Sequence, residues 1–141
     1  MSVKLLTDEL DIARCFAVYQ ELRPHLSSAD ELVKRVITQF TESFQLAAIF
    51  DADNAVACCG FREMNTLAWG KIIYIDDLAT LSSERGKGYA SKLLEFVIQY
   101  AKANGYKEVH LDSGYQRLDA HRLYLNQGFN LSCHHFQLKL S

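Results

Sequence analysis

Apolar residues recur along this chain at two periods, which together predict alternating helices and strands. Spacings of three and four residues predict four helices, at residues 8–22, 28–40, 91–104 and 119–126. Alternating or continuously apolar runs predict six strands, at residues 3–6, 44–50, 55–63, 71–80, 108–112 and 129–140. This order predicts an α/β fold in which a mixed, mostly antiparallel sheet carries helices on both faces.

Polar residues at the predicted helix ends support these boundaries. Thr7 or Asp8 can cap the first helix, and the single proline, Pro24, follows its end. Ser28 and Glu31 have the spacing of a capping box at the start of the second helix. The chain has 141 residues, of which 49% are apolar, so we expect one domain over residues 1–141.

Charge and hydropathy argue against two classes of binding partner, nucleic acids and membranes. A formal net charge of −2 and a pI near 6.2 argue against a nucleic-acid-binding surface, which is normally basic. No apolar run approaches the roughly 18 residues that span a bilayer, and the N-terminal residues lack the apolar core of a signal peptide. We therefore expect a cytoplasmic protein that binds neither nucleic acid nor membrane.

The cysteines and the adjacent histidines do not have the spacing of a metal site. Cys15, Cys58, Cys59 and Cys133 fit neither a zinc motif nor a disulfide framework. The two histidines at 134–135 would diverge on a strand and have no suitably spaced further ligand. We expect buried, reduced thiols and no metal.

A basic, glycine-rich segment, residues 85–90 (RGKGYA), separates the predicted central strand from the third helix. Backbone N–H groups at a helix start are unpaired and lie at the positive end of the helix dipole, so they bind phosphate. Gly86 and Gly88 let a ligand approach the backbone closely, and Arg85 and Lys87 add positive charge. The segment fits neither the P-loop nor the G-x-G-x-x-G pattern, so it predicts a pyrophosphate site of another kind.

Three segments in the second half of the chain, residues 73–80 (IYIDDLAT), 85–90 (RGKGYA) and 120–129 (AHRLYLNQGF), together resemble the GNAT N-acetyltransferase superfamily. Arg85, Gly88 and Ala90 fit its acetyl-CoA signature, [QR]-x-x-G-x-[GA]. Residues 73–80 (IYIDDLAT) resemble the central strand before that signature, and residues 120–129 (AHRLYLNQGF) resemble the A-x-x-L-Y-x-x-x-G-F segment. The resemblance implies the GNAT fold, with six to seven strands splayed at the centre of the sheet, and acetyl-CoA as co-substrate. It places against acetyl-CoA the residues Leu78, Ala79, Thr80, Arg85, Gly86, Lys87, Gly88, Tyr89, Ala90 and Ser91.

The same resemblance gives Tyr124 the role of general acid. Tyr124 aligns with the family tyrosine that protonates the departing CoA thiolate. A phenol, which ordinarily ionises near pH 10, can donate to a thiolate whose conjugate acid ionises near pH 8.5. The alternative is that Tyr124 only packs the short helix against the sheet. Arg117 stands where many relatives carry asparagine, which leaves open how this loop contacts CoA.

Two adjacent carboxylates, Asp76 and Asp77, lie inside the predicted central strand, where charged residues are uncommon. Polyamine-acetylating members of the family resemble the chain here. One aspartate could accept the amine proton through water, attract a cationic amine, or instead organise the splay of the strands. Because successive strand residues face opposite sides, we expect at most one aspartate in the acceptor site. Glu63 and the loop residue Tyr115 are further candidate substrate contacts.

These observations predict an acetyl-CoA-dependent N-acetyltransferase that moves the acetyl group directly to a primary amine, preferably a small cationic molecule. A non-catalytic acyl-CoA-binding or regulatory domain of the same fold is the alternative. A nucleotide-binding module is disfavoured by the missing Walker pattern. Homodimers through the C-terminal strands are common among relatives. The segments that would bind the acceptor carry no recognisable motif, so the sequence leaves the acceptor unidentified.

Overall fold

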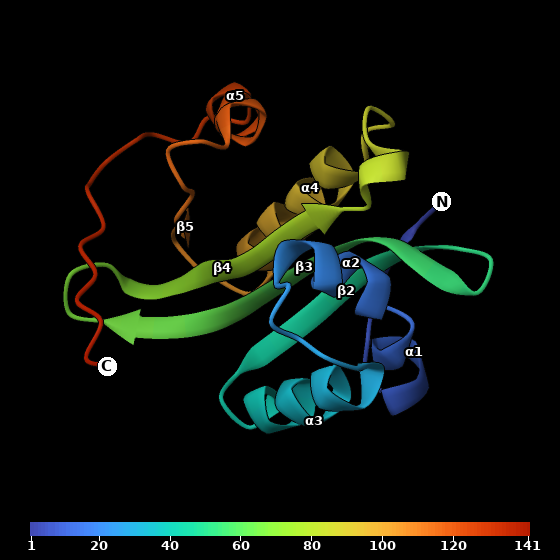
Figure 1. Ribbon diagram of the computed structural model, residues 1–141. Coiled ribbons are helices and arrows are strands. Elements are labelled where there is room, and N and C mark those ends of the chain that lie inside the picture. The colour runs from blue at the N-terminus through green and yellow to red at the C-terminus, as the bar shows by residue number, and fades with distance from the viewer. The chain divides into compact units, whose positions relative to one another are not determined.

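The computed structural model describes residues 1–141, which form two compact units, Met1–His110 and Leu111–Ser141. The first unit begins with β1 (Val3–Leu5), α1 (Glu9–Ala13), α2 (Phe16–Leu22) and α3 (Ala29–Phe40). It continues with the long strands β2 (Phe44–Asp51), β3 (Asn54–Thr66) and β4 (Gly70–Thr80), a short 3₁₀ turn (Ser82–Glu84) and α4 (Tyr89–Ala103). β5 (Val109–Leu111) crosses the boundary between the units, and the second unit contains α5 (Leu118–Asn126) (Figure 1).

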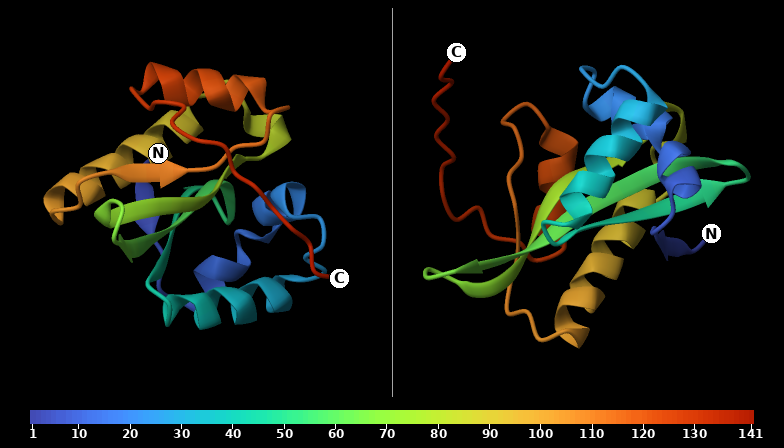
Figure 2. Two further views of the ribbon diagram at one scale, coloured as in Figure 1. Left: turned by 90° about the vertical axis from the view of Figure 1, so that its left-hand side faces the viewer. Right: turned by 90° about the horizontal axis from the view of Figure 1, so that it is seen from below.

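The strands form one mixed sheet in the order β1-β2-β3-β4-β5, and each neighbouring pair from β1 to β4 is antiparallel. Helices α1 to α3 lie on one face and α4 lies on the other (Figure 2). Alternation along β2 directs Leu46 and Ala48 into a buried cluster with Ile12, Val18 and Val36 of the three helices. This packing fixes α2 over the middle of β3 and β4, where the polar residues of the candidate site lie.

The helix predicted over residues 8–22 is divided into α1 and α2. Asp8 caps α1 as expected, since its side chain accepts a hydrogen bond from the Asp11 N–H at 2.8 Å. The helix ends because the Arg14 carbonyl accepts the Ala55 N–H of β3 at 3.1 Å. A tertiary hydrogen bond thus replaces one that would have continued the helix.

The prediction of six to seven strands is wrong, because the sheet has five. The missing strand was expected at residues 129–140, which form neither helix nor strand. Phe136, Leu138 and Leu140 alternate as strand residues do, yet they are 84–91% exposed. Alternation reports the potential to form a strand, but a strand also needs a neighbouring edge with which to pair.

Candidate active site

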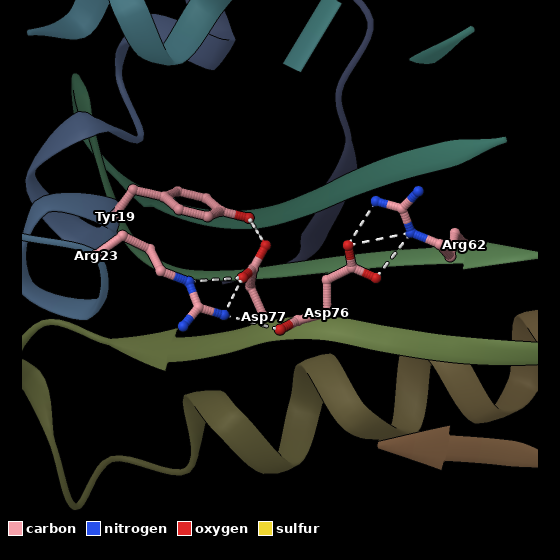
Figure 3. Close-up of polar contacts among 5 residues, drawn as sticks. All are labelled: Tyr19, Arg23, Arg62, Asp76 and Asp77. Carbon is pink, nitrogen blue, oxygen red and sulfur yellow. Dashed lines mark hydrogen bonds and ion pairs between the residues drawn. The ribbon is translucent and has the colours of Figure 1, made fainter. Parts of the chain in front are cut away.

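Asp76 and Asp77 lie on the same face of the sheet, so the expectation that these successive strand residues face opposite sides is wrong. Gly60 pairs with Asp77 and Phe61 pairs with Ile75, so Asp76 is an extra residue in β4. Such a β-bulge interrupts the alternation of side chains. Figure 3 shows both carboxylate groups on the side of β4 away from α4.

The Asp77 carboxylate is held by two side chains from the α2 region. The Tyr19 hydroxyl donates to Oδ2 at 3.1 Å, and the Arg23 guanidinium donates to Oδ1 at 2.6 and 3.2 Å (Figure 3). Burial raises the pKa of Asp77 above its usual value, although Arg23 and Tyr19 act in the opposite direction. Burial, followed by the Asp77 charge, raises the pKa of Tyr19 well above 10, so this phenol is a hydrogen-bond donor at neutral pH.

The Asp76 carboxylate has its own arginine. Arg62 of β3 donates from Nε at 3.0 and 3.1 Å and from Nη2 at 2.6 Å. Arg23 Nη2 also donates to the Asp76 backbone carbonyl at 3.0 Å, which ties α2 to the bulge. Each carboxylate is therefore paired with a guanidinium, and the four side chains together carry no net charge.

Gly60, opposite the bulge, lets β3 approach this cluster closely. A β-carbon at this position would lie 2.5 Å from Phe44 Cζ and 2.9 Å from Asp77 Oδ2. No larger residue fits there unless Phe44 or Asp77 moves. The glycine thus helps to define where the Asp77 carboxylate sits.

The start of α4 has the geometry expected of an anion-binding turn. Gly86 and Gly88 have φ of +81° and +83°, and a β-carbon on either would meet no protein atom within 4 Å. No side chain caps the first turn of α4, so its N–H groups point into this open region. Arg85 is exposed, and Lys87 is paired with Glu84. The turn is therefore open to solvent, whereas the Tyr89 side chain that follows it is buried.

Glu63 is not part of the carboxylate cluster. It follows Arg62 on β3 and therefore faces the other side of the sheet. There it accepts a hydrogen bond from the Tyr106 hydroxyl at 3.0 Å and pairs with Lys71 at 3.2 Å. The structure does not bring this candidate substrate contact to Asp76 and Asp77.

Two further predicted site residues lie in the second unit. Tyr124 is on α5, is buried, and packs its ring against Phe129 with the ring centroids 5.9 Å apart. Tyr115 is 83% exposed, and its hydroxyl lies 3.4 Å from His134 Nδ1. His121 holds this loop through a contact of 2.8 Å between Nε2 and the Gly114 carbonyl.

Sequence reasoning missed Tyr19, Arg23 and Arg62 as site residues. Tyr19 lies within the helix predicted over residues 8–22, and apolar periodicity does not reveal that its hydroxyl bonds to a carboxylate. Arg62 carried a detectable signal, since a charged residue within a buried strand needs a partner just as Asp76 does. Arg23 follows the last residue of α2 and has no comparable signal.

The remaining polar groups suggest no metal site. No group of three or more His, Cys, Asp or Glu side chains could share a metal ion. Cys15, Cys58 and Cys59 are buried free thiols as expected, whereas Cys133 is exposed. None of the helices combines the length and apolar character that crossing a membrane requires.

Comparisons with known proteins show what this chain is similar to. The model of the acetyltransferase (GNAT) family matches residues 11–129. A Bacillus subtilis protein named uncharacterized N-acetyltransferase YhdJ is 32% identical over 136 residues, which cover 96% of each chain.

Solved structures show the same fold at low sequence identity. An acetyltransferase of Trypanosoma brucei has a TM-score of 0.82 and 19% identity, covering 99% of this chain and 100% of the other. A predicted acetyltransferase of Clostridium acetobutylicum, solved with acetyl-CoA, has a TM-score of 0.75 and 17% identity, covering 98% of this chain and 96% of the other.

Proposed function

Because the chain belongs to the acetyltransferase (GNAT) family, we propose that it transfers an acetyl group from acetyl-CoA to a primary amine. The observation that carries this proposal is the open, uncapped turn at the start of α4, directly after the strand that holds Asp76 and Asp77. The family match also crosses the boundary between the two units, which supports one acetyltransferase domain over residues 1–141.

In this proposal the glycine-rich turn holds the cofactor. Backbone N–H groups of residues 85–91 bind the pyrophosphate, with Arg85 and Lys87 adding charge. Backbone groups of Leu78, Ala79 and Thr80 in β4 hold the pantetheine arm. When bound, acetyl-CoA supplies a thioester whose carbonyl carbon the amine attacks.

Asp77 is the proposed base for the amine proton, directly or through one water. Its Oδ1 receives the Arg23 hydrogen bonds and its Oδ2 receives one from Tyr19, so Oδ2 keeps a lone pair for a proton. A carboxylate whose pKa is raised is also a stronger base at neutral pH. Asp76, bound in a bidentate manner by Arg62, would position that arginine and the bulge.

Tyr124 is the proposed acid for the leaving thiolate, and exposed Tyr115 is a proposed contact for the acceptor. A small cationic amine, the acceptor class expected from the sequence, is the first class to test. Arg23 and Arg62 offset the charge of the two aspartates, so the cluster also accommodates an acceptor that carries its own carboxylate.

Thiol release from acetyl-CoA, measured against polyamines, amino acids, aminoglycosides and peptide N-termini, tests this function. We expect turnover with at least one primary amine and none when that amine is replaced by its tertiary analogue, which cannot form an amide. Absence of turnover across the panel, together with acetyl-CoA binding, would contradict catalysis and favour the acyl-CoA-binding alternative.

A pH titration of stability tests the environment of Asp77. A folded-state pKa above the unfolded value means that Asp77 favours folding below the unfolded pKa, near 3.8, and loses that contribution as pH rises through the folded pKa. The free energy of unfolding of wild type relative to Asp77→Asn should therefore increase as pH falls from 7 to 3.5, by ~1.4 kcal/mol per unit of pKa difference.

Urea denaturation of both proteins at each pH provides the measurement, and asparagine keeps the shape of the side chain without its titration. If the free energy of unfolding of wild type relative to Asp77→Asn instead increases as pH rises, the effect of Arg23 on the Asp77 pKa outweighs that of burial. The carboxylate would then be a weaker base than proposed.

A further inference from the structure

A cavity of about 250 Å³ lies in the first unit, at the opposite end of α4 from the glycine-rich turn. Tyr100, in the last turn of α4, lines it, whereas Gly88 caps the first turn. A helix of 15 residues is about 22 Å long at 1.5 Å per residue. The cavity is therefore separate from the region to which we assign the acetyl-CoA pyrophosphate.

Five aromatic side chains border this cavity, of which Phe44 and Phe61 are buried and present almost no surface to it. The five are Phe40, Phe44, Phe61, Tyr100 and Tyr106. Tyr100 packs edge-on against Phe61 at 5.3 Å between centroids and lies nearly parallel to Tyr106 at 6.4 Å. Since aromatic faces carry partial negative charge, a wall of this kind attracts cations.

Glu63 is the one charged residue in the lining. Its Oε2 accepts the Tyr106 hydroxyl at 3.0 Å, and its side chain is 32% exposed. Burial and the charge of Glu63 raise the pKa of Tyr106 to about 12, so at neutral pH this phenol remains a donor that orients the carboxylate. The cavity thus combines one fixed negative charge with aromatic faces.

The protein already places an ammonium group of its own at this carboxylate. Lys71 Nζ lies 3.2 Å from Glu63 Oε1 and 5.8 Å from the centroid of the Tyr106 ring. Lys71 is not part of the lining, and its side chain is 60% exposed, so it can move aside. Its position shows which chemical group the carboxylate and ring attract.

We propose that this cavity binds a small organic ammonium ion, with its charge against Glu63 and its alkyl groups against the aromatic wall. Lys71 competes for the same carboxylate and is displaced when the ion binds. This site does not depend on acetyl transfer, so it can be present whether or not the chain is an active enzyme.

Choline and its neutral carbon isostere, 3,3-dimethylbutan-1-ol, test the proposal in a calorimetric titration of the full chain without acetyl-CoA. Because the two molecules share shape and hydroxyl group, the difference between their affinities measures the contribution of the positive charge. We expect choline to bind at least about tenfold more tightly than the isostere.

Three variants locate the site. Glu63→Gln should weaken choline binding by about tenfold, since it removes the charge and keeps the size of the side chain. Glu95→Gln makes the same change on the exposed surface of α4, outside the lining, and should leave choline binding unchanged. Lys71→Met should strengthen binding by about threefold, because the competing ammonium is gone.

The melting temperature of each variant serves as the check on folding. Equal affinity for choline and its isostere would overturn the proposal, as would equal choline binding by wild type and a folded Glu63→Gln variant. Absence of saturable choline binding in both wild type and Lys71→Met would overturn it as well.

Discussion

Replacement of Gly88 by valine should reduce the affinity for acetyl-CoA by at least about a hundredfold, which corresponds to ~2.7 kcal/mol. Gly88 has φ of +83°, and a β-carbon built on it would point into open space at the uncapped start of α4. A branched side chain there would occupy the region in which the proposed pyrophosphate meets the backbone N–H groups. Isothermal titration with acetyl-CoA measures the effect.

The same helix provides a matched control for backbone strain. Gly105, just after the C-terminus of α4, has φ of +79° and also has no protein atom within 4 Å of a built β-carbon. Valine at either position is forced into the left-handed region, at a cost of about 1–2 kcal/mol. Gly105→Val should therefore lose similar stability and keep its affinity for acetyl-CoA. Equal affinities in the two variants would show that the pyrophosphate site lies elsewhere.

Local sequence signals predicted most elements of the fold correctly. The capping box at Ser28 and Glu31 marked the start of α3, where the Glu31 N–H donates to Ser28 Oγ at 3.1 Å. The glycine-rich turn marked the start of α4 within two residues of its observed position, Tyr89. These features depend on residues close together in the chain, so sequence patterns report them directly.

Features that depend on distant partners were not predictable in the same way. The division between α1 and α2 requires a hydrogen bond from Ala55, and the facing of Asp76 depends on how β3 pairs with β4 around Gly60. The sequence drew attention to the carboxylate pair, because charges are uncommon within a strand. The sequence could not show that Arg23 and Arg62 neutralise the two carboxylates. This pairing adds amines that carry a carboxylate to the acceptors to be tested.

Replacement of Tyr124 by phenylalanine should reduce kcat by about 10²-fold or more, the usual contribution of a positioned general acid. Phenylalanine keeps the ring that packs against Phe129 and removes only the hydroxyl. Affinity for acetyl-CoA should therefore change little, and the melting temperature of the variant serves as the check on folding. Steady-state kinetics with an acceptor found in the amine panel, together with calorimetry, separate the catalytic effect from binding.

Phe129→Leu distinguishes proton donation from packing. This variant removes the aromatic neighbour of Tyr124, whose ring centroid lies 5.9 Å away, but leaves the phenol in place. If Tyr124 is the acid, Phe129→Leu should lose stability, by about 1 kcal/mol, and retain far more kcat than Tyr124→Phe. If Tyr124 serves only to pack α5, Tyr124→Phe will keep full kcat and Phe129→Leu will be the more damaging change. That outcome would transfer the role of acid to another donor near the leaving thiolate.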